Sequence, residues 1–156
     1  MPLESTTTES ARLEIAIGVD SDLVEAASQL YPQLNPAAVP PTEDQLREII
    51  ASPATTLILA RDPANGDRII GSLILATFRL GSGLKAIIED VVVDSAARGK
   101  GVGEALSREA LRIAEERGAV MVDLTSLPAR EAANRLYQRI GFKKRDTNVY
   151  RFEISE

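Results

Sequence analysis

The sequence predicts an α/β domain whose mixed, mostly antiparallel sheet is flanked by helices. Three observations support this fold class. Period-two and helical apolar patterns alternate along the 156 residues. An Asn65-Gly66 pair separates two β-rich runs, which is a strong hairpin signal. A strand, helix and strand pattern over residues 85–126 predicts one right-handed parallel unit. The length fits one ordinary domain.

The first elements come from local patterns. Residues 11–18 alternate polar and apolar side chains, as a half-buried strand does. Residues 20–31 have a helical pattern, with Asp20 or Ser21 as its cap. The proline-rich segment 32–41 predicts a loop.

A second helix is expected over residues 42–52, because Thr42 is followed three residues later by Gln45 in a capping-box pattern. Three strands then form a meander over residues 55–62, 68–80 and 85–94, with turns at Asn65-Gly66 and at residues 81–83.

The last third predicts two more helices and two more strands. A helix is expected over residues 101–117, and Gly118 ends it. A strand follows at 119–126, and a helix begins at Pro128 and ends before Gly141. A last strand is expected at residues 147–154.

Composition excludes several kinds of site. The chain has no cysteine and no histidine. A disulfide framework is impossible, and no metal site of the usual thiolate or imidazole type is expected. Proton transfer near neutral pH must use carboxylates, tyrosine, lysine or water, since histidine is missing.

Charge and hydropathy limit the partners. The net charge is −5, so nucleic acid is not an expected partner. No apolar run approaches about 18 residues, and residues 1–10 lack a signal-peptide pattern. We expect no membrane partner, a cytoplasmic protein, a disordered lead at residues 1–10 and a single domain at 11–156. Residues 127–151 carry seven basic side chains against two acidic ones. Both a local anion site and a solvated basic face fit that excess.

A glycine-rich loop stands between the valine-rich strand and the next helix. Unpaired backbone N–H groups and the helix dipole favour an anion at a helix start, and glycines let a phosphate approach closely. The pattern therefore predicts a pyrophosphate cradle, although a tight turn without a ligand also fits. It is not a P-loop, because Glu104 follows the last glycine, and its glycine spacing does not match a dinucleotide fingerprint. The loop residues are Arg98, Gly99, Lys100, Gly101, Val102 and Gly103.

Two motifs resemble the GNAT superfamily of N-acyltransferases. Residues 98–103 match its acyl-CoA pyrophosphate loop, Arg/Gln-x-x-Gly-x-Gly/Ala, and residues 132–142, AANRLYQRIGF, resemble its Ala-x-x-Leu-Tyr-x-x-x-Gly-Phe segment. The resemblance covers residues 12–154. It implies that the fourth and fifth strands splay apart, and that the pantetheine arm of acyl-CoA pairs with the backbone of Val91, Val92 and Val93.

The resemblance also implies roles for single residues. Tyr137 is the expected acid that protonates the leaving thiolate, although its spacing also fits a packed core tyrosine. Glu89 is the expected base, acting through water, although a strand-end salt bridge also fits. Many members carry Asn where this chain has Arg130, so we expect Asn134, one helical turn away, to offer the polar contact instead.

The implied activity is an acetyl-CoA-dependent N-acetyltransferase. A primary amine of a small molecule or a peptide would attack acetyl-CoA directly in a ternary complex, since no cysteine is present to carry the acyl group. The alternative is a non-catalytic acyl-CoA-binding sensor or regulatory module of the same fold. The acceptor is not readable from the sequence. A homodimer, a state frequent in the superfamily, stays open.

Overall fold

A computed structural model describes residues 11–155, and these divide between Thr125 and Ser126 into two compact units. The predicted disordered lead at residues 1–10 lies outside the described residues.

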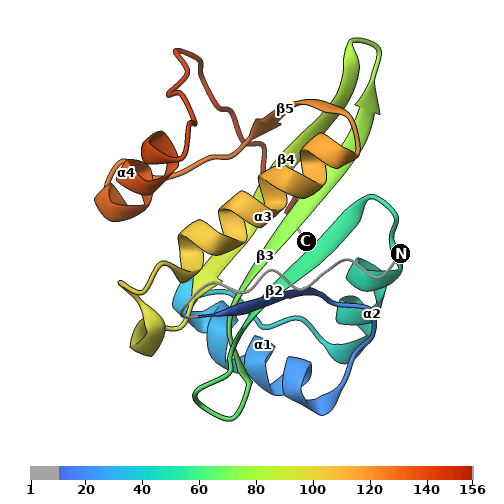
Figure 1. Cartoon of the computed structure of the whole chain (residues 1–156). Helices are drawn as coiled ribbons and strands as arrows, with labels where there is room; N and C mark the ends of the chain where they lie inside the picture. The colour runs from blue at the N-terminus through green and yellow to red at the C-terminus, as the bar shows by residue number, and fades with distance from the viewer. Residues whose placement is uncertain (1–10, 156) are drawn as a thin grey trace. The chain divides into compact units, whose positions relative to one another are not determined.

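The first unit is built on a five-stranded sheet in the order β1-β2-β3-β4-β5 (Figure 1). The first three strand pairs are antiparallel, and β4 pairs with β5 in parallel. The predicted mixed, mostly antiparallel sheet is therefore confirmed. The strands are β1 Arg12–Ile15, β2 Thr55–Asp62, β3 Arg68–Leu80, β4 Gly83–Val93 and β5 Ala119–Asp123.

Three α-helices cover this sheet: α1 Ser21–Leu34, α2 Glu43–Ala51 and α3 Val102–Glu116. Their caps follow the sequence signals. The side chain of Asp20 accepts from the N–H of Leu23, and Thr42 and Gln45 form the predicted capping box.

Helix α1 is longer than predicted. We expected a loop from Pro32, but the helix continues to Leu34. Proline lacks the N–H of a helical hydrogen bond and its ring crowds the carbonyl one turn earlier, yet the N–H of Asn35 still donates to the carbonyl of Tyr31 at 3.1 Å. One proline near the end of the helix therefore does not stop it.

The helices bury both faces of the sheet. Alternation along β3 directs Ile74 to the cluster under α1 and α2, and directs Leu73 and Leu75 to the opposite face. Gly71, on that opposite face, lies against Val102 and Leu106 of α3. Complete burial of such an aliphatic side chain is worth about 1.5–3 kcal/mol. The two layers therefore fix α1 and α3 on opposite faces of the long β3–β4 hairpin.

Strands β4 and β5 pair only along the first part of β4. Among the described residues, their parallel pairing runs from Leu84 with Ala119 to Ile87 with Asp123, while β4 continues to Val93. Beyond Ile87, β4 has no β5 partner within the described chain, and its residues Ile88, Glu89, Val92 and Val93 pair with β3 alone. This agrees with the predicted splay of the fourth and fifth strands.

The second unit contains one helix, α4 Glu131–Arg139, among its described residues. The helix begins after the predicted start at Pro128, because residues 128–129 form a turn in which the N–H of Arg130 donates to the carbonyl of Leu127. Arg130 itself is not helical, with φ −83° and ψ 63°.

The predicted strand at residues 147–154 is wrong. Residues 143–155 form no regular helix or strand, and the apolar side chains of Val149, Tyr150, Phe152 and Ile154 are at least 75% exposed. Alternating apolar residues indicate a strand only where a neighbouring strand pairs with the backbone, and this segment has no such partner within the described chain.

None of the helices in the described part of the chain is long and apolar enough to cross a membrane.

We expect Gly71→Ala to destabilise the fold by about 1–3 kcal/mol through overpacking. A Cβ at Gly71 would lie 3.1 Å from the carbonyl oxygen of Val92, 3.2 Å from Leu106 Cδ1 and 3.3 Å from Val102 Cγ1. Urea unfolding of the variant measures the loss. Gly18→Ala is the matched control, because a Cβ there meets no atom within 4 Å. Equal stability of the two variants would contradict the close approach of α3 to the sheet.

Candidate functional site

The site begins at a β-bulge in β4. Ser72 of β3 pairs with Val92, and Ile74 pairs with Glu89. Between these two pairs β4 has two residues, whereas β3 has one. Asp90 occupies the bulge with φ +50°, a left-handed conformation that Asp and Asn tolerate better than most residues. The bulge lies in the part of β4 that has no β5 partner.

The bulge changes where the two carboxylates point. Regular alternation would send Glu89 and Asp90 to opposite faces, but alternation does not hold at a bulged residue. Glu89 pairs with Ile74, whose side chain belongs to the cluster under α1, and Glu89 is exposed. Asp90 is half-buried, and burial raises the pKa of its carboxyl.

Tyr31 of α1 is the residue that sequence reasoning missed. It is buried, and burial together with the negative charge of Asp90 raises its pKa to about 12. Its spacing from Ala27 and Leu23 is that of a core position, which is the only signal the sequence gives. Asp90 and Tyr31 therefore form an electrostatically linked pair between β4 and α1.

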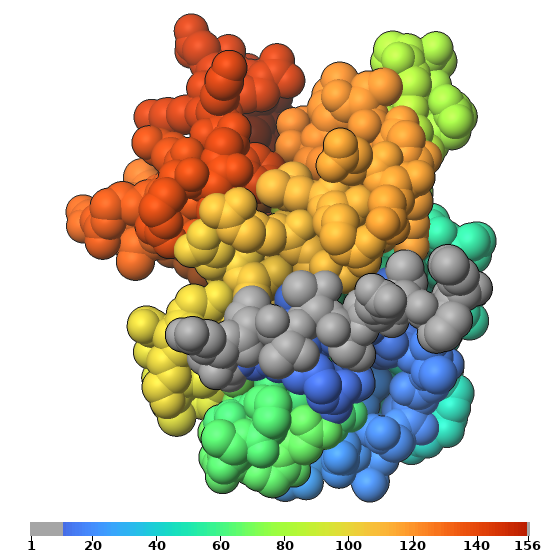
Figure 2. Space-filling view, viewed as in Figure 1, coloured from blue at the N-terminus to red at the C-terminus, as the bar shows by residue number. Residues whose placement is uncertain are grey.

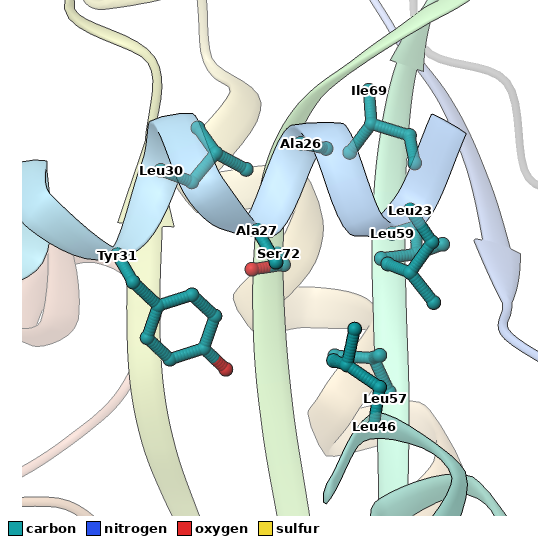
Figure 3. A pocket seen from close by; sticks show the side chains of 10 residues that line it. All are labelled: Leu23, Ala26, Ala27, Leu30, Tyr31, Leu46, Leu57, Leu59, Ile69 and Ser72. Carbon is teal, nitrogen blue, oxygen red and sulfur yellow. The ribbon is translucent and has the colours of Figure 1, made fainter. Parts of the chain in front are cut away.

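An apolar cavity lies between α1 and the sheet, and Tyr31 and Ser72 supply its polar side-chain atoms (Figure 3). The cavity belongs to the core cluster of the first unit and is separate from the glycine loop in the sequence. The residues that line it are Leu23, Ala26, Ala27, Leu30, Tyr31, Leu46, Leu57, Leu59, Ile69 and Ser72.

The glycine-rich loop ends in a helix start without a side-chain cap. Gly99 and Gly101 have φ +77° and +79°, a conformation that favours glycine. Gly101 is the N-cap of α3, and the first helical bond runs from the N–H of Ala105 to its carbonyl at 3.0 Å. The first-turn amides at residues 102–104 therefore point out of the helix end, which is the arrangement that anions bind.

The side chains around this helix start fall into two groups. Arg98, Gly99, Lys100 and Gly101 are exposed, and the segment lies at the molecular surface, in yellow in Figure 2. Val102 is only 2% exposed, so it can offer a ligand its backbone N–H alone.

The predicted pantetheine strand is packed rather than open. Val92 is buried in the core under α1, while Val91 and Val93 are partly buried. Side-chain packing leaves the backbone edge of these residues as the group that a ligand can pair with. The first unit thus places Glu89, the three valines and the glycine loop on one continuous stretch of chain.

Asp123 belongs to an ion pair at the end of the parallel pairing. Its Oδ2 lies 2.9 Å from Nζ of Lys85, and both side chains are partly exposed. Asp123 also pairs with Ile87 at the last β4–β5 position. The ion pair therefore holds the two strands together where they begin to separate, which is a structural role.

The second unit contains the remaining predicted residues. Tyr137 is 7% exposed and meets Phe142 edge to face at 5.8 Å. Burial raises the pKa of Tyr137, and the positive charge of Arg130 opposes the shift. Asn134 uses its amide to donate to the carbonyl of Leu127 at 3.0 Å. Asn134 therefore holds the turn before α4, a role the sequence did not indicate.

Among residues 11–155, no group of three or more His, Cys, Asp or Glu side chains is arranged to hold a metal ion.

Comparison with known proteins identifies the family. The family described as "Acetyltransferase (GNAT) family" matches residues 21–142, which is most of the chain. The chain belongs to the GNAT acetyltransferase family. The predicted family and the predicted enzyme class, an acyltransferase, are therefore confirmed.

Two curated relatives from Oryza sativa subsp. japonica are similar to this GNAT protein. A glucosamine 6-phosphate N-acetyltransferase 1 is 30% identical over 83% of this chain and 80% of its own length. A probable glucosamine 6-phosphate N-acetyltransferase 2 is 37% identical over 60% of this chain, and the match spans only 57% of that relative's length.

A solved structure supports the fold alone. An aminoglycoside acetyltransferase, meta-AAC0020 from an uncultured soil metagenomic sample, superposes with a TM-score of 0.80 at 15% identity. The match covers 94% of this GNAT protein and 97% of that chain.

We expect Asp90→Asn to stabilise the protein at neutral pH. Because the folded-state pKa of Asp90 is raised, its favourable contribution is present below the unfolded pKa and is lost as pH rises through the folded pKa. Asparagine removes the buried charge and tolerates the left-handed backbone.

Urea unfolding at pH 7 and near pH 3 checks this expectation, with Glu89→Gln as the exposed control. The gain for Asp90→Asn should appear at pH 7 and shrink at the lower pH. A variant that is less stable than the native protein at pH 7 would contradict the cost of burying this carboxylate.

Proposed function

We propose that the protein is an N-acetyltransferase that transfers the acetyl group of acetyl-CoA to a primary amine by direct attack in a ternary complex. The observation that carries the proposal is the arrangement of the first unit. Residues 94–101 connect the end of β4, which has no β5 partner among the described residues, to a glycine-rich helix start without a side-chain cap. Family membership makes acyl-CoA the ligand that fits both features.

The donor would use backbone groups and two cations. The β4 edge at Val91, Val92 and Val93 would pair with the pantetheine arm, and the amides of residues 98–103 would hold the pyrophosphate. Arg98 and Lys100 add positive charge beside those amides. Since the whole chain has a net charge of −5, these local donors, rather than long-range attraction, would select the polyanionic ligand.

Transfer requires one proton to leave the amine and one to reach the thiolate. The amine nitrogen attacks the thioester carbon, a C–N bond forms, the C–S bond breaks, and CoA leaves as a thiolate. Tyr137 would donate the proton to that sulfur. A free thiol has a pKa of about 8.5 against about 10 for tyrosine, so this transfer is uphill by roughly 2 kcal/mol before positioning. Burial raises the pKa of Tyr137, so the phenol is protonated at neutral pH and its positioning beside the sulfur would have to offset a larger cost.

The need for a base depends on the acceptor. An amine with a pKa of about 10.4 is neutral once in roughly 2,500 molecules at pH 7, which costs about 4.6 kcal/mol. An amine with a pKa near 8 loses only about 1.4 kcal/mol. Glu89 is our candidate base, acting through water, because it is exposed on β4 beside the bulge.

We propose a phosphorylated amino sugar as the first acceptor to test. The support is that the two relatives from Oryza sativa are a glucosamine 6-phosphate N-acetyltransferase and a probable second enzyme of that kind. Lys143, Lys144 and Arg145 are exposed in the second unit and add the positive charge that a phosphate attracts. We further propose that the protein is cytoplasmic, where acetyl-CoA is available.

A thiol-release assay with acetyl-CoA tests the function. The panel contains glucosamine 6-phosphate, glucosamine, a polyamine and peptides with a free N-terminus or lysine. We expect CoA release with glucosamine 6-phosphate and a much lower kcat/KM with glucosamine. CoA binding by calorimetry without release for any amine would favour the non-catalytic sensor, and no CoA binding would refute both readings.

Tyr137→Phe should lower kcat by about 10²-fold while the KM for acetyl-CoA changes little, since the phenol acts on the departing thiolate. Steady-state kinetics across pH 6–10 measure the effect. Tyr150→Phe is the matched control, because Tyr150 is 87% exposed in the same unit. Full kcat with an unchanged pH profile in Tyr137→Phe would show that another group supplies the proton.

A further inference from the structure

Gln33, near the end of α1, reaches across the first unit to the segment that precedes the glycine loop. Its side-chain oxygen accepts a hydrogen bond from the backbone N–H of Ser95 at 2.8 Å, between residues 62 positions apart in sequence. Its side-chain nitrogen donates to the carbonyl of Gln29 at 3.1 Å. Both ends of the amide are therefore engaged, and the side chain is held in one orientation.

Ser95 lies in the segment that connects the two proposed donor-binding surfaces along the chain. It opens a short 3₁₀ turn, η1 Ser95–Ala97, which is separated from β4 by Asp94 alone and directly precedes Arg98. The pantetheine edge ends at Val93, so residues 94–97 set the distance and angle between that edge and the pyrophosphate amides.

This connection is fixed from three directions. The N–H of Asp94 donates to the carbonyl of Ile70 at 2.8 Å, which continues the pairing with β3. The Asp94 carboxylate caps the N–H of Ala96 at 3.2 Å and meets Arg68 at 3.3 Å. These contacts come from the turn itself and from the sheet, whereas Gln33 comes from a helix.

The Gln33 side chain satisfies a different backbone N–H of this turn from the one that Asp94 satisfies. The N–H groups at the start of a helical turn have no partner within the turn, and a side-chain oxygen is their usual partner. Asp94 takes the N–H of Ala96, and Gln33 takes the N–H of Ser95. Removing Gln33 would return the Ser95 N–H to water and loosen the turn on its α1 side.

We propose that Gln33 is a positioning residue for donor binding, which holds the glycine loop in register with the end of β4 for the nucleotide half of acyl-CoA. The inference rests on the proposed function, because the ligand is the proposed donor. Gln33 would not contact the donor itself. It acts through Ser95, so its effect should fall on donor affinity rather than on the chemical step.

The primary test compares Gln33→Ala with Gln29→Ala. Gln29 lies one turn earlier on α1, is exposed, and contacts Gln33 only through its backbone carbonyl, which the substitution keeps. We expect Gln33→Ala to raise the KM for acetyl-CoA and the Kd of CoA about fivefold, the value of one ordinary hydrogen bond, with kcat within twofold of native. Gln29→Ala should match the native protein.

A truncated donor distinguishes a positioning role of Gln33 from a general structural defect of the variant. S-acetyl-pantetheine lacks the pyrophosphate and nucleotide, so its KM should be the same for Gln33→Ala and the native protein. An equal loss with both donors would overturn the proposal, because a structural defect would weaken both.

A second variant removes the other partner of the hydrogen bond. Ser95→Pro deletes the N–H, and proline is compatible with the position because Asp94 has φ −50° and ψ 133°. It should reproduce the donor defect of Gln33→Ala, and the double variant should be no worse than either single one. Ser95→Ala keeps the N–H and should behave as native. Additive losses in the double variant would overturn the proposal.

Failure of this inference is distinguishable from failure of the proposed function. If the native protein does not bind CoA, the proposed function fails. If the native protein binds CoA and Gln33→Ala binds it equally well, only the role of Gln33 is refuted. If CoA binds but no amine is acetylated, the Kd values of CoA and pantetheine for the same variants still decide the role of Gln33.

Discussion

The part of β4 beyond Ile87 is constrained by one-sided backbone pairing, and the candidate site depends on that constraint. A strand inside a sheet satisfies its backbone N–H and C=O groups on both edges, and an edge strand leaves one row to be satisfied by something else. Here the long hairpin with β3 holds β4 rigidly, while pairing with β5 stops at Asp123. The result is a strand edge without a β5 partner in the described part of the chain, which is the edge proposed to pair with the pantetheine arm.

The bulge at Asp90 and the burial of its carboxylate lower the stability of the fold, and packing in the rest of the first unit offsets this loss. A non-glycine residue with positive φ is strained, and a half-buried carboxylate is disfavoured in its charged form. Tyr31 is buried near enough to feel that charge, so α1 is electrostatically linked to the bulge. Close packing of α3 against Gly71 on the opposite face holds the same hairpin in place. Unfavourable terms of this kind concentrate at functional sites, which favours this end of β4 as the reacting end.

Helix α1 connects these features in a way that fold class alone does not indicate. Leu23 and Leu30 pack into the core. The negative charge of Asp90 raises the pKa of Tyr31, and Gln33 accepts a hydrogen bond from the turn that leads into the glycine loop. One helix therefore interacts electrostatically with Asp90 at the bulge and forms a hydrogen bond with the segment before the loop. Gln33 itself belongs to the proline-rich segment 32–41, whose residues beyond α1 begin at Asn35.

Local signals in the sequence determined most of the first unit. The capping box at Thr42 and the Asn65-Gly66 hairpin depend on a few neighbouring residues, and each was predicted at its observed place. The glycine spacing and the Tyr137 segment also determined the family. Tertiary structure alone decided the bulge at Asp90, the burial of Tyr31, the contact between Gln33 and Ser95 and the absence of a strand at residues 147–154. The physical reason is that each of these depends on a partner far away in the chain. Whether a strand forms depends on its pairing edge, and a pKa depends on what packs around the group.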